Sequence, residues 1–169
     1  MDEEPKRSTD PVAILLCAIN STAVEEGILN LMASANLDFV RSLYSAWGRG
    51  DFSSAEWADP EIEFVIADGP ARGSWAGLAG MAAGWRSWLS AWEDLRIEVD
   101  EYRELDNERV LVLAQGFALG KTSALETARL QSQAASLFHM RGGKVTKMVI
   151  YFDRHRAFSE LGISREGGS

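Results

Sequence analysis

Two ionisable side chains lie where a folded chain could use them for proton transfer. Asp68 comes just after a segment of alternating polar and apolar residues, and His139 lies inside a later apolar segment. At the edge of an apolar cavity, a carboxylate or an imidazole could act as a general acid or base. The competing interpretation is that Asp68 is solvated in a loop and that His139 is only hydrogen-bonded. Both are therefore weak candidates for catalysis.

Asp153 is a third carboxylate in a suggestive place, because it follows the last apolar segment of the chain. If Met148, Ile150 and Phe152 point into a cavity, alternation along a strand turns Asp153 the other way. A carboxylate just before a helix can accept hydrogen bonds from the free N–H groups of the first turn. We predict that Asp153 caps a short helix.

Arg109 and Gln115 are polar positions in a segment that is otherwise apolar on both faces. Buried polar side chains need hydrogen-bond partners. A bound ligand would supply such partners, and so would an internal hydrogen bond or a contact with a second copy of the chain. The sequence leaves these alternatives open.

The composition excludes several classes of function. A net charge of −8 argues against non-specific binding to nucleic acid or to an anionic membrane. The single cysteine, Cys17, excludes an intrachain disulfide, and with two histidines we predict no metal site and no cofactor. Six Trp and seven Phe are a large aromatic supply for 169 residues, and such side chains can line a pocket for a flat organic ligand.

The sequence divides into an N-terminal extension at residues 1–35, one domain at 36–163 and a tail at 164–169. The extension is acidic, and its apolar run at residues 12–19 is far shorter than the roughly 20 residues that cross a bilayer. It fits either a loosely docked pair of helices or a start codon placed too early, with Met32 as the true start. The acidic start does not suit a signal peptide, so we predict a cytoplasmic protein.

Hydrophobic periodicity places the elements that must position these side chains. Apolar residues at helical spacing predict a helix from Asn36 that ends at Gly48 or Gly50, and then helices over 52–57, 77–92 and 154–161. Alternation predicts strands over 61–66, 95–100, 109–119, 128–140 and 144–152, with a bulge at Glu101-Tyr102 and a tight hairpin at residues 141–143.

This order predicts an α+β domain. A strongly bent antiparallel sheet would wrap around the N-terminal helices, with a short C-terminal helix after the last strand. Gly80 and Gly84 weaken the 77–92 helix but would let it lie close to the sheet. Such an architecture leaves a cavity between the concave sheet and the helices.

Several segments together resemble the SnoaL-like family of the nuclear transport factor 2-like superfamily. These are Gly-Arg-Gly-Asp51-Phe52 after the first helix, Trp57-Ala-Asp-Pro-Glu-Ile-Glu-Phe64, and the final hairpin and helix from Phe138 to Gly162. The resemblance covers about residues 36–162 and implies the cone-shaped fold with an apolar pocket. The pocket residues that we predict are Tyr44, Trp47, Trp57, Phe64, Ile66, Trp85, Trp88, Arg109, Leu111, Leu113, Gln115, Phe138, Met148, Ile150 and Phe152.

The resemblance also implies which known chemistries this chain lacks. Where epoxide hydrolases of this fold keep two aspartates beside an arginine at Arg109, the chain has Leu111 and Ile150, and Ile150 also falls at the acid position of SnoaL-type cyclases. Where ketosteroid isomerases keep a first-strand acid, a tyrosine and a second acid, it has Val65 or Ile66, Leu43 and Ser136. A hydrocarbon cannot accept a proton, so both activities are disfavoured.

Two functions remain from the sequence. The first is a pocket protein that binds a small apolar or aromatic molecule; as an enzyme it would be an isomerase, cyclase or lyase that works by proton transfer. The alternative is a non-catalytic binding or dimerisation domain with the fold but not the chemistry. Either form would be a homodimer without a nucleic-acid or membrane partner.

Overall fold

The computed structural model describes residues 27–28, 31, 35–69, 71–90, 92–120 and 129–165. The predicted extension at residues 1–35 and the end of the predicted tail, residues 166–169, therefore lie almost wholly outside the described residues. Within the described residues, no helix has both the length and the apolar composition needed to cross a bilayer.

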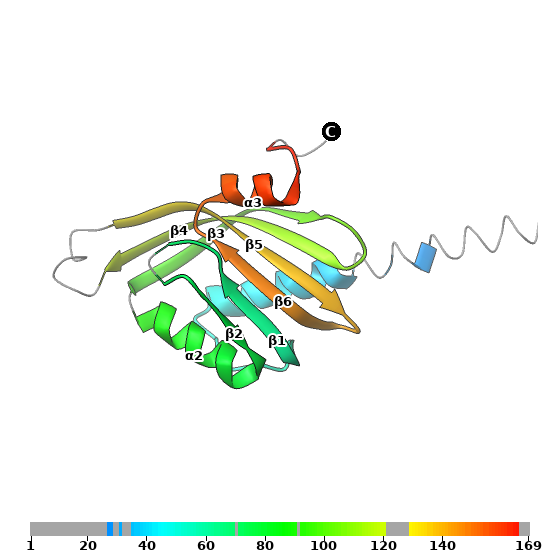
Figure 1. The fold of residues 1–169 in the computed structure, drawn as a ribbon, viewed down its shortest axis with the longest axis horizontal. Coiled ribbons are helices and arrows are strands. Elements are labelled where there is room, and N and C mark those ends of the chain that lie inside the picture. The colour runs from blue at the N-terminus through cyan, green and yellow to red at the C-terminus, as the bar shows by residue number, and fades with distance from the viewer. Residues whose placement is uncertain are drawn as a thin grey trace, which may run out of the picture.

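A helix at residues 35–48 opens the described domain, and a six-stranded sheet follows. The sheet order is β2-β1-β6-β5-β4-β3. The strand bounds are β1 Ala58–Ile66, β2 Gly73–Ala76, β3 Trp92–Glu104, β4 Arg109–Gly120, β5 Arg129–Arg141 and β6 Lys144–Tyr151. Two more helices are α2 (Gly77–Ser90) and α3 (Arg154–Leu161). Figure 1 shows α3 on one side of the curved sheet, with α2 and the 35–48 helix on the other.

The α+β class, the bent sheet and the closing helix are confirmed, but the sheet is mixed rather than antiparallel. β1 runs parallel to β6, with Phe64 opposite Met148, while all other neighbouring strands are antiparallel. Alternation predicts which residues share a face, but it does not give the direction of strands that are distant in sequence. The parallel pair therefore could not be predicted from the pattern.

The bend of the sheet comes partly from β3. Its pairing with β4 shifts between Glu93 and Arg96 and again between Val99 and Glu101, which leaves Asp100 as an extra residue. An extra residue bends a strand and increases its twist. The bulge that the sequence predicts at Glu101-Tyr102 is thus present one residue earlier.

The sheet buries apolar side chains on both faces. The concave face packs with α2 and the 35–48 helix around Ile62, Phe64 and Ile66, the inward set predicted for the first strand. The convex face packs under α3, where Leu111 lies in one cluster with Phe158. Both faces of the central strands are therefore core.

Two predicted helices need correction. The helix predicted over 52–57 is absent, because Asp51 instead accepts hydrogen bonds from the backbone and hydroxyl of Ser53 in a local turn. The helix predicted over 77–92 ends at Ser90, and Trp92 begins β3. The short strand β2 does not follow from the alternation pattern, because three of its four residues, Gly73, Ser74 and Ala76, are small.

The contact between α2 and the sheet depends on Gly84. A methyl group at this position would lie 2.8 Å from Cδ2 of Trp75 and 3.0 Å from Cδ1 of Phe64. Both rings come from paired strands, since Phe64 is opposite Trp75. The absent side chain at Gly84 therefore sets how closely α2 approaches the sheet, as the sequence predicts.

We predict that Gly84→Ala lowers the free energy of unfolding by about 1–2 kcal/mol, because the clash exceeds the gain in helix propensity. Gly48→Ala is the control: Gly48 lies at the end of the first helix with open space around it. The control should be as stable as the wild type or up to about 1 kcal/mol more stable. Urea unfolding measures both, and a Gly84→Ala protein as stable as the wild type would contradict this account.

Candidate functional site

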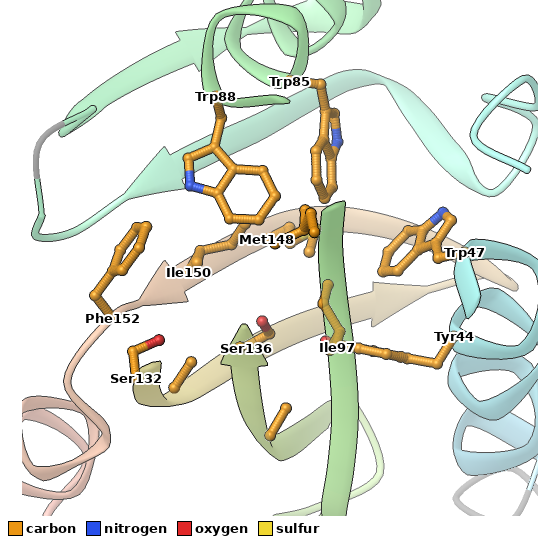
Figure 2. Close-up of a pocket in the computed structure, with 14 residues that line it drawn as sticks. Tyr44, Trp47, Trp85, Trp88, Ile97, Ser132, Ser136, Met148, Ile150 and Phe152 are labelled. Atoms are coloured by element: carbon orange, nitrogen blue, oxygen red, sulfur yellow. The ribbon is translucent and has the colours of Figure 1, made fainter. Parts of the chain in front are cut away.

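The cavity of this protein lies between α2 and the concave face of the sheet. Figure 2 shows Trp85 and Trp88 above it, Tyr44 and Trp47 at one end and Phe152 at the other. The cavity has an open volume of about 50 Å³. The lining residues are Tyr44, Trp47, Trp85, Trp88, Leu95, Ile97, Ala114, Gly116, Ser132, Ala134, Ser136, Met148, Ile150 and Phe152.

The floor of the cavity is made of small residues on β4 and β5. Ala114 pairs with Ala134, and Gly116 pairs with Ser132. A methyl group on Gly116 would lie 3.3 Å from the Ser132 hydroxyl oxygen. These short side chains leave the space that the tryptophans of α2 do not fill.

Tyr44 and Ser136 form a polar pair within this apolar wall. Burial raises the pKa of the Tyr44 phenol well above its ordinary value of 10, and a hydrogen bond with the Ser136 side chain offsets only part of the shift. The phenol is therefore neutral at any physiological pH. It can donate or accept a hydrogen bond, but it cannot serve as an anionic base.

None of the described residues that line the cavity is a carboxylate, a histidine, a lysine or an arginine. Within the described residues there is also no cluster of three His, Cys, Asp or Glu side chains that could hold a metal ion. The chemistry of the cavity, as far as it is described, is that of aromatic rings, aliphatic groups, hydroxyls and indole N–H groups.

The structure brings part of the predicted pocket set together around the cavity: Tyr44, Trp47, Trp85, Trp88, Met148, Ile150 and Phe152. A second part lies in the same core without lining the cavity: Trp57, Phe64, Ile66 and Phe138. Trp57 has its own partner, since its indole N–H donates to the Ser54 carbonyl at 2.9 Å. Ligand contact by any of these residues stays a prediction.

The third part of the predicted set lies on the wrong face of the sheet. Leu111 and Leu113 pack beneath α3. Arg109 pairs with Asp106 at 2.8 Å, and Gln115 donates to Asp100 at 3.0 Å. The prediction failed because β4 is apolar on both faces, so alternation could not show which face meets the cavity. For Arg109 and Gln115, the internal hydrogen bond is the alternative that the structure shows.

Sequence reasoning missed the other half of the cavity wall: Leu95, Ile97, Ala114, Gly116, Ser132, Ala134 and Ser136. A signal for the floor was present. Small residues alternate at Ala114 and Gly116 on β4, and again at Ser132, Ala134 and Ser136 on β5. Side chains this small on one face of two adjacent strands indicate space above the sheet.

The carboxylate of Asp68 has a structural role instead of facing the cavity. It accepts hydrogen bonds from the backbone N–H of Phe152 at 2.6 Å and of Asp153 at 3.3 Å. The ring of Phe152 lies against Gly69, where a methyl group would be 2.7 Å from it and where φ is +83°. Asp68 and Gly69 together position the side chain that closes one end of the cavity.

His139 and Asp153 also have structural surroundings. His139 follows the buried Phe138 on β5, so it points to the convex face, opposite Arg109 and Lys147 on the neighbouring strands. Burial, and then these two positive charges, hold the pKa of His139 below its ordinary value, so the ring is neutral at pH 7. Asp153 accepts from the backbone N–H of His155 and caps α3, which confirms that prediction.

We predict that Asp68→Ala lowers the free energy of unfolding by about 1–3 kcal/mol, because it leaves the part-buried N–H of Phe152 without an acceptor. Asp59→Ala is the control, since Asp59 accepts only one local, exposed hydrogen bond, from Glu61. It should cost less than about 1 kcal/mol. Equal losses in the two variants, measured by urea unfolding, would argue against the anchoring role of Asp68.

The buried phenols predict a fall in stability at alkaline pH. Burial raises the pKa of Tyr151 to about 12 and that of Tyr44 further, whereas phenols of the unfolded chain titrate near 10. Above pH 10 the unfolded chain loses these protons first, so unfolding becomes more favourable as the pH rises. Between pH 10 and 11, Tm should fall less steeply in Tyr44→Phe than in the wild type. Parallel decreases would contradict the burial of the Tyr44 phenol.

Comparison with known proteins agrees with this fold. No curated protein sequence matches the chain. An NTF2-like protein of unknown function from Burkholderia pseudomallei has 19% identity and a TM-score of 0.62, covering 74% of this chain and 95% of its own. A putative SnoaL-like polyketide cyclase from a Jannaschia species has 17% identity and a TM-score of 0.60, covering 79% and 94%. TerC, co-crystallised with polyporic acid, has 24% identity and a TM-score of 0.56, covering 75% and 97%.

Identities this low show the fold alone, but the match to a family is more specific. Residues 40–148, well over half of the chain, match the SnoaL-like domain. This match includes β1 to β5 and the first helix from Val40 onward. The chain therefore belongs to the SnoaL-like domain family of the NTF2-like fold.

Proposed function

We propose that this protein binds a small, neutral, apolar or aromatic molecule in the cavity beneath α2. The main support for the proposal is the composition of the cavity wall. Tryptophans on one side face a floor of small residues on the other, and the described lining holds no charged group. Burying an unpaired charge costs several kcal/mol, so such a wall selects neutral molecules. Aromatic rings on the opposite side favour a flat ligand.

The cavity must widen to hold a ligand of one ring. Its open volume of about 50 Å³ exceeds the roughly 10–15 Å³ that one water molecule needs but is below the roughly 150 Å³ of a cavity that binds benzene. We infer that Trp85 moves on binding, because it is the tryptophan of α2 that is only partly buried.

A groove beside the cavity offers a route of entry. It lies between the 35–48 helix and β3 and has an open volume of about 400 Å³. Four residues line both spaces: Tyr44, Trp47, Leu95 and Ile97. Since β3 is an edge strand, movement of these side chains would join the groove to the cavity without breaking a central strand.

The geometry favours binding over proton transfer. Asp68 holds backbone N–H groups, His139 lies on the convex face, and the buried Tyr44 phenol stays neutral. A general acid or base must reach the proton that it transfers. Polyporic acid, with which TerC was co-crystallised, supports only a small organic ligand, by analogy of fold alone.

The cytoplasmic location and the homodimer stay predictions, and sedimentation velocity tests the second.

Ethylbenzene is a suitable probe for this proposal, because it is flat, neutral and one ring in size. It should raise the Tm of the wild type, since a ligand that binds only the folded state stabilises it. Ala134→Leu should abolish the shift by filling the floor of the cavity. Gln133→Leu is the matched control, because Gln133 is the exposed neighbour on the other face of β5, and it should keep the shift.

No shift in the wild type would reject the pocket proposal. An equal shift in the wild type and in Ala134→Leu would place the binding of ethylbenzene outside the cavity.

A further inference from the structure

The groove between the 35–48 helix and β3 is an apolar surface that stays open to solvent. Its open volume of about 400 Å³ is larger than that of the cavity. Phe52 in its lining is 39% exposed, and Leu95, Ile97 and Val99 on β3 are only partly buried. Apolar side chains that are gathered in one exposed patch mark a surface that another segment or molecule covers.

One wall of this groove is a free strand edge. β3 is the last strand of the sheet and, within the described residues, it pairs with β4 alone. An edge strand presents a row of backbone N–H and C=O groups that no neighbouring strand uses. An extended segment can pair with such an edge and place alternate side chains in the groove beside it. The surface therefore fits an extended, apolar segment of chain.

The same chain contains a segment of this kind outside the described residues. Residues 12–19, Val-Ala-Ile-Leu-Leu-Cys-Ala-Ile, are apolar throughout. Eight residues are an ordinary length for a β-strand. Each Val, Ile and Leu side chain gains free energy when it leaves water, so this segment favours an apolar surface over solvent.

Three arginines surround the groove, and none of them forms a salt bridge within the described residues. Arg96 belongs to the lining. The guanidinium carbon of Arg41 lies 5.3 Å from the ring centroid of Tyr102, which is also part of the lining. Arg49 donates a hydrogen bond at 2.9 Å to Ser45, a third lining residue. The groove thus has positive charge available at several points of its rim.

The apolar segment has acidic residues on both sides. Four precede it and two follow it: Asp2, Glu3, Glu4, Asp10, Glu25 and Glu26. They outnumber the basic residues of the same stretch, Lys6 and Arg7, while the groove lining contains one carboxylate, Glu98. Surface ion pairs contribute little energy each, but complementary charges favour one partner and one position over others.

The segment can reach the groove from the start of the described chain. Arg41 marks one end of the groove, and a helix from Gly27 to Arg41 would rise about 21 Å. The eight residues from Ile19 to Glu26 cover about 26 Å when they are extended. The segment is therefore long enough to dock on its own domain without any change in the sheet.

We propose that residues 12–19 dock in this groove as an added strand along the free edge of β3 in the same chain. One face of the segment packs on Leu95, Ile97 and Val99, and its acidic flanks lie near Arg41 and Arg49. Docked there, the segment covers the route by which a ligand would enter the cavity. This consequence rests on the proposed binding function, whereas the docking itself does not.

Cys17 allows a test on the full chain, because it is the single cysteine and lies within the segment. A nitroxide attached to its thiol broadens the backbone amide signals of residues that lie near it. The signals of residues 95–99 should lose most of their intensity, and those of β2, at the opposite edge of the sheet, should keep theirs. Reduction of the nitroxide with ascorbate gives the reference spectrum.

Ile14→Asp should restore the signals of residues 95–99, because a carboxylate in the segment is costly to bury against apolar side chains. Ser8→Asp is the matched control, since it adds the same charge outside the apolar run, and it should keep the broadening. Both positions lie outside the described domain, and an unchanged Tm checks that neither substitution alters its fold.

A mixture of nitroxide-labelled chains with unlabelled, nitrogen-15-enriched chains shows which chain the segment binds. Broadening of residues 95–99 in that mixture as strong as in the labelled protein would place the segment on a second copy and overturn the proposal. Equal broadening of β2 and β3, or of neither, would also overturn it. If residues 95–99 alone are broadened and ethylbenzene leaves Tm unchanged, the docking is supported and only the binding proposal fails.

Discussion

The close approach of α2 to the first two strands is the contact on which the cavity depends. Gly84 lies directly against the rings of Trp75 and Phe64, so α2 approaches the sheet more closely than a residue with a side chain would allow. That distance places Trp85 and Trp88 above a floor of Ala114, Gly116 and their partners on β5. The space between the tryptophans and the small residues is the cavity. The bulge at Asp100 bends β3, which adds Leu95 and Ile97 to the cavity wall.

Parts of the fold could be predicted where a local sequence pattern is compatible with only one structure. The hairpin at Gly142-Gly143, with φ of 58° and 74°, and the helix that Asp153 caps and Gly162 ends were both predictable from local chemistry. Which face of β4 meets the cavity could not be predicted, because Leu111 and Ala114 are both apolar and the sheet is covered on both sides. The parallel pairing of β1 with β6 was also not predictable, since it joins segments far apart in the chain.

The same limit explains which residues of the candidate site could be predicted from the sequence. Tyr44 and the tryptophans of α2 could be placed near a pocket from helical spacing and aromatic content. The polar residues could not, because their roles depend on neighbours from distant segments. Asp68 accepts from the backbone after β6, and Gln115 donates to Asp100 on the adjacent strand. Side chains that looked chemically active therefore hold the walls in place.

We propose that this SnoaL-like domain binds a neutral, flat molecule and does not transfer protons, because the described cavity wall holds no charged group. The described polar groups of this wall are the Tyr44 phenol, two serine hydroxyls and the indole N–H groups of the lining tryptophans. A crystal structure of the protein soaked with ethylbenzene tests this most directly. The account predicts the ring between the tryptophans of α2 and Ala134. A ligand bound elsewhere on the protein would contradict it.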